Sequence, residues 1–184
     1  MGNTLNIGLG LKSGGVSSGG AGLFAVSGTE ASLNQNRWLV PRRYKSGDYL
    51  SGASEDFSTS ELATIDFDTN IRLEQFVADG TIQPVRYEIM IATQQTETEL
   101  DAKLQFGLFR ANPANGDATL TYLFSEIGSL FPNTTTNTIQ KLSGTISETL
   151  IAGTICSFGF YNPSGTPATQ DIDNLKYWIT VYFN

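Results

Sequence analysis

Apolar and polar residues alternate along several short segments of this 184-residue chain. Every second position from Val85 to Ile91 is apolar, and the same holds from Leu104 to Leu108. Because successive side chains of a strand point to opposite faces, this period predicts half-buried strands. With five further segments rich in β-branched and aromatic residues, the predicted strands are 62–67, 71–77, 84–93, 103–110, 138–146, 154–161 and 175–183.

Turn-forming residues such as Asp79-Gly80 and Asn115-Gly116 separate these segments. Residues 120–130 fit either a short helix or an edge strand, and no long stretch shows the apolar stripe of an amphipathic helix. Seven or eight strands with turn-rich connections predict an all-β fold. We expect an antiparallel β-sandwich with jelly-roll topology over residues 37–184.

Residues 1–36 differ from the rest of the chain, because Lys12 and Glu30 are their only charged residues and glycine is concentrated there. Glycine loses more conformational entropy on ordering than other residues. We therefore predict that this segment is an extended N-terminal arm that has too little core to fold alone.

The arm nevertheless contains apolar residues at the period of a strand, and a second apolar cluster follows its glycine run. An apolar face of this kind fits the sheet edge or groove of a neighbouring chain. Packing back on its own sandwich and a flexible tether are the two alternatives. The residues predicted to bind a partner are Leu5, Ile7, Leu9, Leu11, Leu23 and Phe24.

Composition and charge exclude several functions. The chain has no histidine, so histidine-dependent triads and zinc hydrolase sites are absent. A net charge of -7 with few clustered cations argues against nucleic acid. No apolar stretch approaches the roughly 20 residues of a membrane span, and no secretory signal begins the chain. Asn133 is accordingly interpreted as a chance glycosylation sequon, and Cys156 as a buried, inert thiol.

Three pairs of acidic residues are candidates for catalysis or cation binding: Asp66 with Asp68, Glu97 with Glu99, and Asp171 with Asp173. The first fits a solvated strand face better than a catalytic cleft, and the third fits a hydrogen-bonded loop better than a calcium site. Lys12-Ser13 lacks the glycine and the strand-to-helix context of a phosphate-binding loop. We predict no enzymatic activity, no cofactor and no metal.

Aromatic residues offer an alternative, because exposed rings stack on sugars. The candidates are Trp38, Tyr44, Tyr49, Tyr161, Trp178 and Tyr182. Trp178 and Tyr182 fall on one face of the last predicted strand, and the other face is apolar as well. A strand that is apolar on both faces is typical of an interior or an interface rather than a sugar platform.

The order of these motifs over residues 37–162 resembles the jelly-roll virion proteins of tailed bacteriophages, which include capsid decoration proteins, head fibres and small tail-fibre domains. The resemblance is one of pattern rather than of a signature motif. The matching elements are Trp38–Pro41 with Tyr49, Ile71–Leu73, Ala102–Arg110, Asn115-Gly116, a strand from Ile139, and Thr149–Thr154.

The resemblance implies a homotrimer on the surface of a virion, made in the host cytoplasm. A chain this short without fibre repeats resembles a capsid decoration, or cement, protein more than a tail fibre. We therefore predict a structural protein whose arm attaches it to the major capsid protein or another virion protein, without nucleic acid or membrane as partner. A receptor-binding tail module that recognises a host glycan is the alternative, and a carbohydrate-active enzyme is a third hypothesis.

Overall fold

The computed structural model describes residues 22–42, 54–62, 65–66, 73–78, 83–93, 104–111, 119–120, 122–130, 138–163 and 171–184. These ranges contain one helical turn, α1 (Thr59–Leu62). Within them, no helix is long and apolar enough to cross a membrane. The strands are β1 (Gly22–Leu33), β2 (Arg37–Pro41), β3 (Ser54–Phe57), β4 (Ile65–Asp66), β5 (Phe76–Val77), β6 (Pro84–Ala92), β7 (Leu104–Ala111), β8 (Thr119–Leu120), β9 (Leu123–Leu130), β10 (Gln140–Thr145), β11 (Ile155–Asn162) and β12 (Ile172–Phe183).

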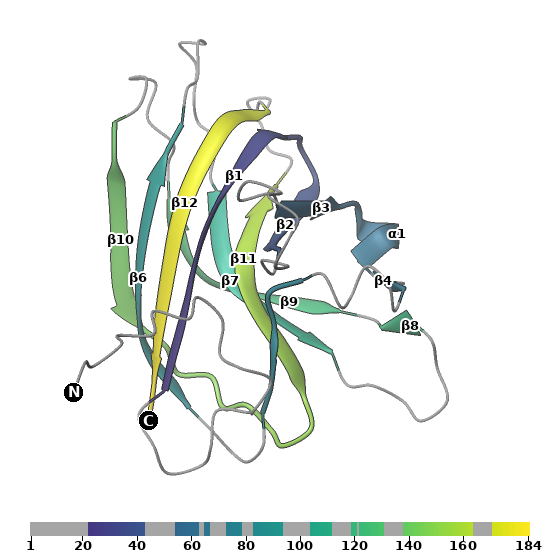
Figure 1. Cartoon of the computed structure of the whole chain (residues 1–184), viewed down its shortest axis with the longest axis vertical. Helices are drawn as coiled ribbons and strands as arrows, with labels where there is room; N and C mark the ends of the chain where they lie inside the picture. The colour runs from purple at the N-terminus through teal and green to yellow at the C-terminus, as the bar shows by residue number, and fades with distance from the viewer. Residues whose placement is uncertain are drawn as a thin grey trace, which may run out of the picture.

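Two antiparallel sheets face each other and form a sandwich (Figure 1). Sheet A has the strand order β1-β12-β6-β10. Sheet B has the order β3-β2-β11-β7-β9, with β5 paired to β11, and β4 pairs separately with β8. The long strands pair as β1 with β12, β2 with β11, β6 with β10, and β7 with β9. The first long strand pairs with the last, the second with the second to last, and so on inwards, which is the connectivity of a jelly roll. The predicted fold class is confirmed.

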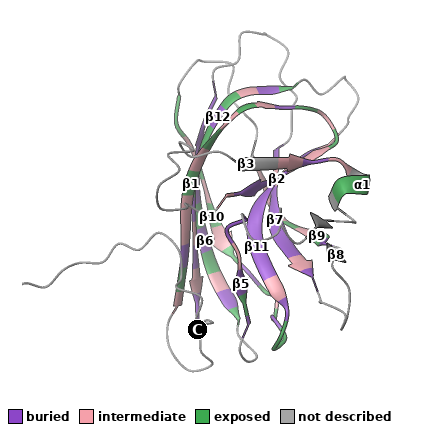
Figure 2. Ribbon diagram, turned by 45° about the vertical axis from the view of Figure 1, so that its right-hand side comes forward, coloured by how far each residue is buried: buried purple, intermediate pink, exposed green. Residues whose placement is uncertain are grey.

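The main core lies between the two sheets, whose strands carry the buried residues (Figure 2), and it combines aliphatic side chains with a group of aromatic rings. Cys156, Phe158 and Phe160 of β11 point into it and are fully buried. The ring centroid of Phe158 lies 6.1 Å from that of Phe106 in β7 and 5.3 Å from that of Phe24 in β1. Large apolar side chains from both sheets therefore hold the sandwich together.

Sheet B also carries a second, smaller core on its outer side, which includes Phe57, Phe109 and Tyr122. This second core explains why β11 is buried on both faces. Gly159 of β11 faces Gly107 of β7 on this side of the sheet. A Cβ at Gly159 would overlap the carbonyl oxygen of Leu39, so only glycine fits there.

The predicted boundary between arm and sandwich at residue 36 is wrong for residues 22–33. These residues form β1, an edge strand that pairs with β12 from Gly22 opposite Phe183 to Leu33 opposite Ile172. The sandwich core covers the inward residues of β1, which offsets the conformational entropy that its glycines lose. Residues 1–21, the rest of the predicted arm, lie outside the described residues.

Five predicted strands are confirmed as β6, β7, β10, β11 and β12. Residues 120–130, which fitted either a helix or an edge strand, contain β9 at the edge of sheet B. Within the described part of the predicted strand 62–67, Leu62 ends the helical turn α1 and Ile65–Asp66 forms β4. Within the described part of 71–77, only Phe76–Val77 forms a strand.

Candidate interaction surface

The outer face of sheet A is the side of this sheet that points away from the core, and β12 and β6 occupy its middle. Their outward residues lie opposite one another, as Trp178 does to Met90 and Tyr182 to Arg86. The face consists of Leu23, Ala25, Ser27 and Thr29 of β1, Lys176, Trp178, Thr180 and Tyr182 of β12, Arg86, Glu88 and Met90 of β6, and Lys141, Ser143 and Thr145 of β10.

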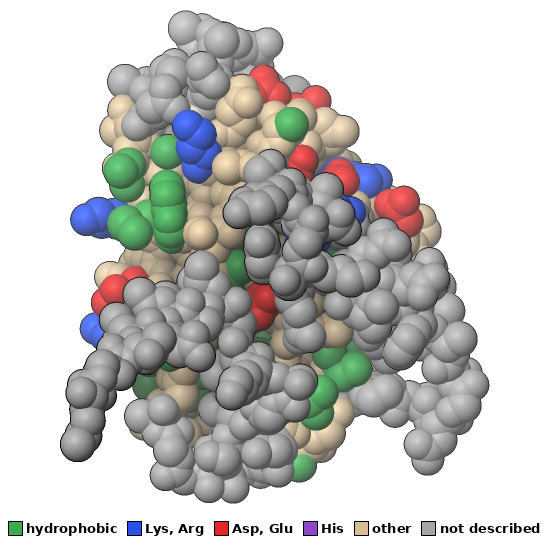
Figure 3. Space-filling view, viewed as in Figure 1, with side chains coloured by type: hydrophobic (Ala, Val, Ile, Leu, Met, Phe, Trp, Pro, Cys, Tyr) green, Lys and Arg blue, Asp and Glu red, His purple; other side chains and the backbone are tan. Residues whose placement is uncertain are grey.

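Two exposed apolar residues lie next to each other on this face, and a third directly precedes its edge strand β10. Trp178 is 41% exposed, Met90 is 36% exposed, and Ile139, which precedes β10, is 57% exposed. Lys141 lies opposite Met90 on β10, and Lys176 is the next outward residue to Trp178 on β12. Figure 3 shows apolar side chains gathered between basic side chains on the side of the molecule where β6, β10 and β12 lie. We call Trp178, Met90 and Ile139 the apolar patch.

Tyr182, Arg86 and Glu88 form a compact polar group beside the apolar patch. The guanidinium of Arg86 lies 4.1 Å from the ring centroid of Tyr182, in a cation–π arrangement. Arg86 also pairs with Glu88 at 3.1 Å, and the Tyr182 hydroxyl donates a long hydrogen bond of 3.5 Å to Glu88. Glu88 therefore offsets the charge of Arg86 locally, and the positive charge beside the patch comes from Lys141 and Lys176.

The aromatic residues expected to contact sugars lie in two places. Trp38 of β2 and Tyr161 of β11 stack on each other on the outer side of sheet B, with centroids 4.2 Å apart and an interplanar angle of 18°. Each ring covers one face of the other, and both residues are half-buried. Trp178 instead presents its ring to solvent on sheet A, while Tyr44 and Tyr49 lie outside the described residues.

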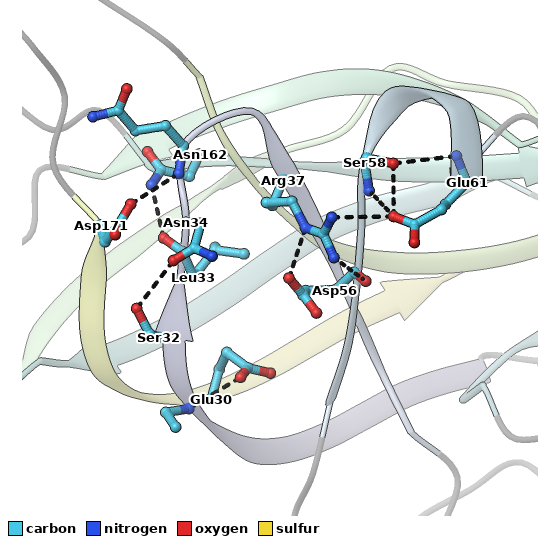
Figure 4. Close-up of polar contacts among 12 residues, drawn as sticks. Glu30, Ser32, Leu33, Asn34, Arg37, Asp56, Ser58, Glu61, Asn162 and Asp171 are labelled. Carbon is cyan, nitrogen blue, oxygen red and sulfur yellow. Dashed lines mark hydrogen bonds and ion pairs between the residues drawn. The ribbon is translucent and has the colours of Figure 1, made fainter.

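A network of charged and polar groups joins β2, β3 and α1 (Figure 4). The Arg37 guanidinium donates to the Asp56 carboxylate at 2.7 Å and to that of Glu61 at 3.1 Å. The Ser58 hydroxyl and amide also donate to Glu61, at 2.6 and 2.7 Å, and these bonds, followed by Arg37, lower its pKa. The hydrogen bond from Arg37 to Asp56 raises the pKa of Arg37. The network fixes one end of sheet B, and the carboxylates of Asp56 and Glu61 are both hydrogen-bonded within it.

The predicted acidic pairs are only partly described. Asp171 accepts a hydrogen bond of 3.1 Å from the Gln35 amide, so it holds the turn between β1 and β2 (Figure 4). Only Asp171 lies in the predicted loop, because Asp173 belongs to β12, where it pairs with Ser32 of β1, so the expectation of a loop is wrong at Asp173. Among the described residues, no three acidic or cysteine side chains are grouped as metal ligands. The side chain of Asp66, and Asp68, Glu97, Glu99 and Lys12-Ser13, lie outside the described residues.

Cys156 is fully buried in the main core, which confirms the interpretation from sequence. Burial raises the pKa of its thiol to about 12. The Sγ–H donates weakly to the carbonyl oxygen of Thr154 at 3.8 Å. At neutral pH the thiol is protonated and inaccessible, so it cannot act as a nucleophile.

The residues predicted to bind a partner divide into three groups. Leu5, Ile7, Leu9 and Leu11 lie outside the described residues. Leu23 is 44% exposed on the outer face of sheet A, and its neighbour Phe24 is 3% exposed. Phe24 packs in the core of its own sandwich, where no partner can reach it, so the prediction that it binds a partner is wrong.

Sequence reasoning did not identify Met90 and Ile139 as surface residues. Met90 occupies an outward position in a strand whose other outward residues are charged. This departure from alternation was the available indication, together with the two apolar faces of β12. Neither shows which strands are neighbours, and the sheet order alone brings Trp178 beside Met90.

No known protein family matches the chain, and no curated protein sequence matches it. Among solved structures, the chain is similar to the globular domain of zebrafish complement 1qA protein. The two are 12% identical, with a TM-score of 0.31, over 80% of this chain and 96% of that one.

Proposed function

We propose that this chain is a non-enzymatic structural protein of a bacteriophage virion, a decoration protein that attaches to the head and stabilises it through buried contact area. The observation that supports the proposal is where β1 begins and β12 ends. Gly22 pairs with Phe183, so β1 begins at the end of sheet A where β12 finishes. The residues before Gly22 along the chain, which include Leu5 to Leu11, are connected to the sandwich through this strand.

This arrangement separates attachment from the body of the protein. β12 has 12 residues, so the sandwich extends about 40 Å away from the attachment end, at ~3.3 Å per residue. The alternating residues Leu5 to Leu11 would add a strand to a sheet edge of the major capsid protein, another virion protein or a second copy of this chain. The sandwich would then form the outer knob on the particle surface.

The chemistry of the described residues supports a structural role. The carboxylates of Asp56 and Glu61 bind Arg37, and Asp171 caps a backbone amide. Each of these acids joins two segments of the sandwich. Cys156 is buried and protonated. Among the described residues, these acidic side chains are therefore used to hold the fold, and the thiol lies in its core.

Location is tested by labelling tailed-phage particles from the source culture with a gold-conjugated antibody against the sandwich. We expect label over the heads. Label confined to the tail would support the receptor-binding alternative, and unlabelled particles would overturn the virion proposal.

The attachment mechanism is tested by deleting residues 1–21, which leaves β1 intact. The shortened chain should fold and lose co-sedimentation with particles. A variant with serine at Leu5, Ile7, Leu9 and Leu11 should behave in the same way. Its matched control, with serine at Thr4, Asn6, Gly8 and Gly10, should still bind. If the shortened chain co-sedimented with particles as fully as the wild type, attachment through the arm would be refuted.

The exposure of Trp178 favours one alternative function, recognition of a host glycan by a receptor-binding tail module. Its ring is open to solvent and lies near Lys141 and Lys176, which suit an acidic sugar. A glycan array with wild-type protein and Trp178→Ala distinguishes the two functions. Binding that disappears with Trp178→Ala would support the alternative, whereas the decoration proposal expects no saccharide binding.

A further inference from the structure

We propose that the outer face of sheet A binds a second copy of this chain, at a different surface of that copy, so that the copies close into a ring. This inference deepens the assembly function proposed above and names the surface involved. It rests on the apolar patch, on the charge of the face and on the area that the face offers.

The first step is the apolar patch itself. The outward face of an antiparallel sheet is polar when it faces water. Here Trp178 and Met90 are adjacent across β12 and β6, and Ile139 directly precedes β10. Tryptophan and methionine are enriched at the centres of protein interfaces, where a few such residues supply most of the binding energy. The patch therefore has the composition of an interface centre.

The second step is charge, which selects the occupant. The outer face of sheet A contains three basic residues, Arg86, Lys141 and Lys176, and one acidic residue, Glu88. The chain has 11 basic and 18 acidic residues in total. The remainder of each molecule therefore carries eight basic and seventeen acidic side chains. A basic face on an acidic molecule is complementary to the other surfaces of a second copy.

The same charges disfavour a face-to-face dimer. Two copies of this face would bring two surfaces of net positive charge together, and like charges across an interface are unfavourable. Contact between different surfaces is heterologous, and heterologous contacts make closed rings when the rotation between copies closes. Charge thus favours a ring over a two-fold dimer.

The third step is area. Four strands about 4.8 Å apart make the face roughly 19 Å wide, and the nine residues of β6 make it about 30 Å long. The flat area is therefore about 600 Å², before the relief of the side chains is added. A stable interface buries about 800 Å² on each partner. The flat face therefore supplies about three quarters of that area, and only the whole face, rather than the patch alone, approaches the size of a specific contact.

The mass of the full chain in solution tests the inference, measured by sedimentation equilibrium over a range of concentrations. We expect a closed assembly of at least three copies, which for three copies of 19.9 kDa is about 60 kDa. Trp178→Ser should weaken association by about 30-fold or more, because it removes a central aromatic contact. Trp178→Phe keeps an apolar ring and is the matched control, which should still associate.

Charge is tested on the same instrument. Lys141→Glu with Lys176→Glu should reduce association, and the double arginine variant should not. Added salt should weaken the wild-type assembly. Circular dichroism and urea unfolding of each variant show that the fold is kept.

A wild-type monomer at all concentrations overturns the inference, and so does an assembly that Trp178→Ser leaves unchanged. A two-copy species overturns the heterologous contact. Gold-labelled phage particles together with a monomeric protein would leave the virion proposal standing and reject this surface alone.

Discussion

Two adjacent residues of β1 should differ sharply in their effect on stability. Phe24 is 3% exposed and Leu23 is 44% exposed, and their side chains point to opposite faces of sheet A. If β1 is part of the sandwich, Phe24→Ala removes a core residue, and Leu23→Ala shortens a surface one. If residues 22–36 belonged to an arm that folds only on a partner, neither change would alter the stability of the isolated chain.

The magnitude follows from the surroundings of the Phe24 ring. Its centroid lies 5.3 Å from that of Phe158 and 6.0 Å from that of Phe76. Burial of a phenylalanine side chain contributes about 1.5–3 kcal/mol, and each aromatic pair adds about 0.5–1.5 kcal/mol. Phe-to-Ala changes in cores cost about 3–5 kcal/mol. Because β1 is an edge strand that can move into the cavity, we expect about 3 kcal/mol for Phe24→Ala and at most about 0.5 kcal/mol for Leu23→Ala.

Urea unfolding followed by the fluorescence of Trp38 and Trp178 measures both changes. With a slope of about 2 kcal/mol per molar urea, Phe24→Ala should lower the midpoint by about 1.5 M, and Leu23→Ala should lower it by about 0.25 M or less. All samples need the same protein concentration, since self-association would raise the apparent stability. Equal shifts at the two positions would refute the placement of β1 in the sandwich.

Three further outcomes test other features of the fold. Deletion of residues 1–21 should leave a protein that unfolds cooperatively. Deletion of residues 1–36 should abolish folding, because it removes the partner of β12 and uncovers Phe158. A folded circular dichroism spectrum of the 1–36 deletion would contradict this. Gly159→Ala should destabilise the chain by about 1–3 kcal/mol in urea unfolding, because its Cβ would overlap the Leu39 backbone. Gly153 has a φ of 83° and open space around it, so Gly153→Ala should cost only its backbone strain, about 1 kcal/mol. Equal costs would argue against the close approach of the Leu39 carbonyl to Gly159. The Cys156 thiol, whose pKa is raised to about 12, should react with a thiol reagent at pH 8 only after unfolding. It should also make the free energy of unfolding fall as the pH rises from about 9 towards 12, because the unfolded chain releases this proton first. Rapid labelling of the native protein, or a Cys156→Ala variant with the same alkaline profile as wild type, would contradict this.

The fold class followed from sequence because alternation is a local property. In β6, the inward residues Tyr87, Ile89 and Ile91 are buried and the outward residues from Arg86 to Met90 are exposed, as the period requires. The same pattern located β7, whereas β12 was predicted from its β-branched and aromatic residues. Such patterns do not depend on which strands are neighbours, so they remain visible without the tertiary structure.

Two strands, β9 and β1, could not be assigned from sequence, and each has a physical reason. In β9 the register shifts between its pairings with Phe106 and Gly107, so one extra residue, Ile127, interrupts the alternation. In β1, glycine and small residues give no clear alternation, although the segment is an edge strand that is held in place by its pairing with β12. In both cases the stabilising partner is distant along the chain.

The candidate surface was only half predictable for a related reason. The two apolar faces of β12 indicated that Trp178 lies at an interior or an interface. The residues that surround it, Met90 and Lys141, come from β6 and β10, and their positions depend on the sheet order. A surface made from three separate strands has no single segment of sequence that describes it.

The pairing of Gly22 with Phe183 also determines how the molecule would carry force. The hydrogen bonds between β1 and β12 run across the two strands. Tension between the two chain ends would act along these bonds and open the ladder one pair at a time. Tension that enters at Gly22 and is resisted by the far end of the sandwich would act along the axis of β1 and shear many pairs at once. A protein anchored through residues before Gly22 and held through its body is therefore pulled in its strong direction.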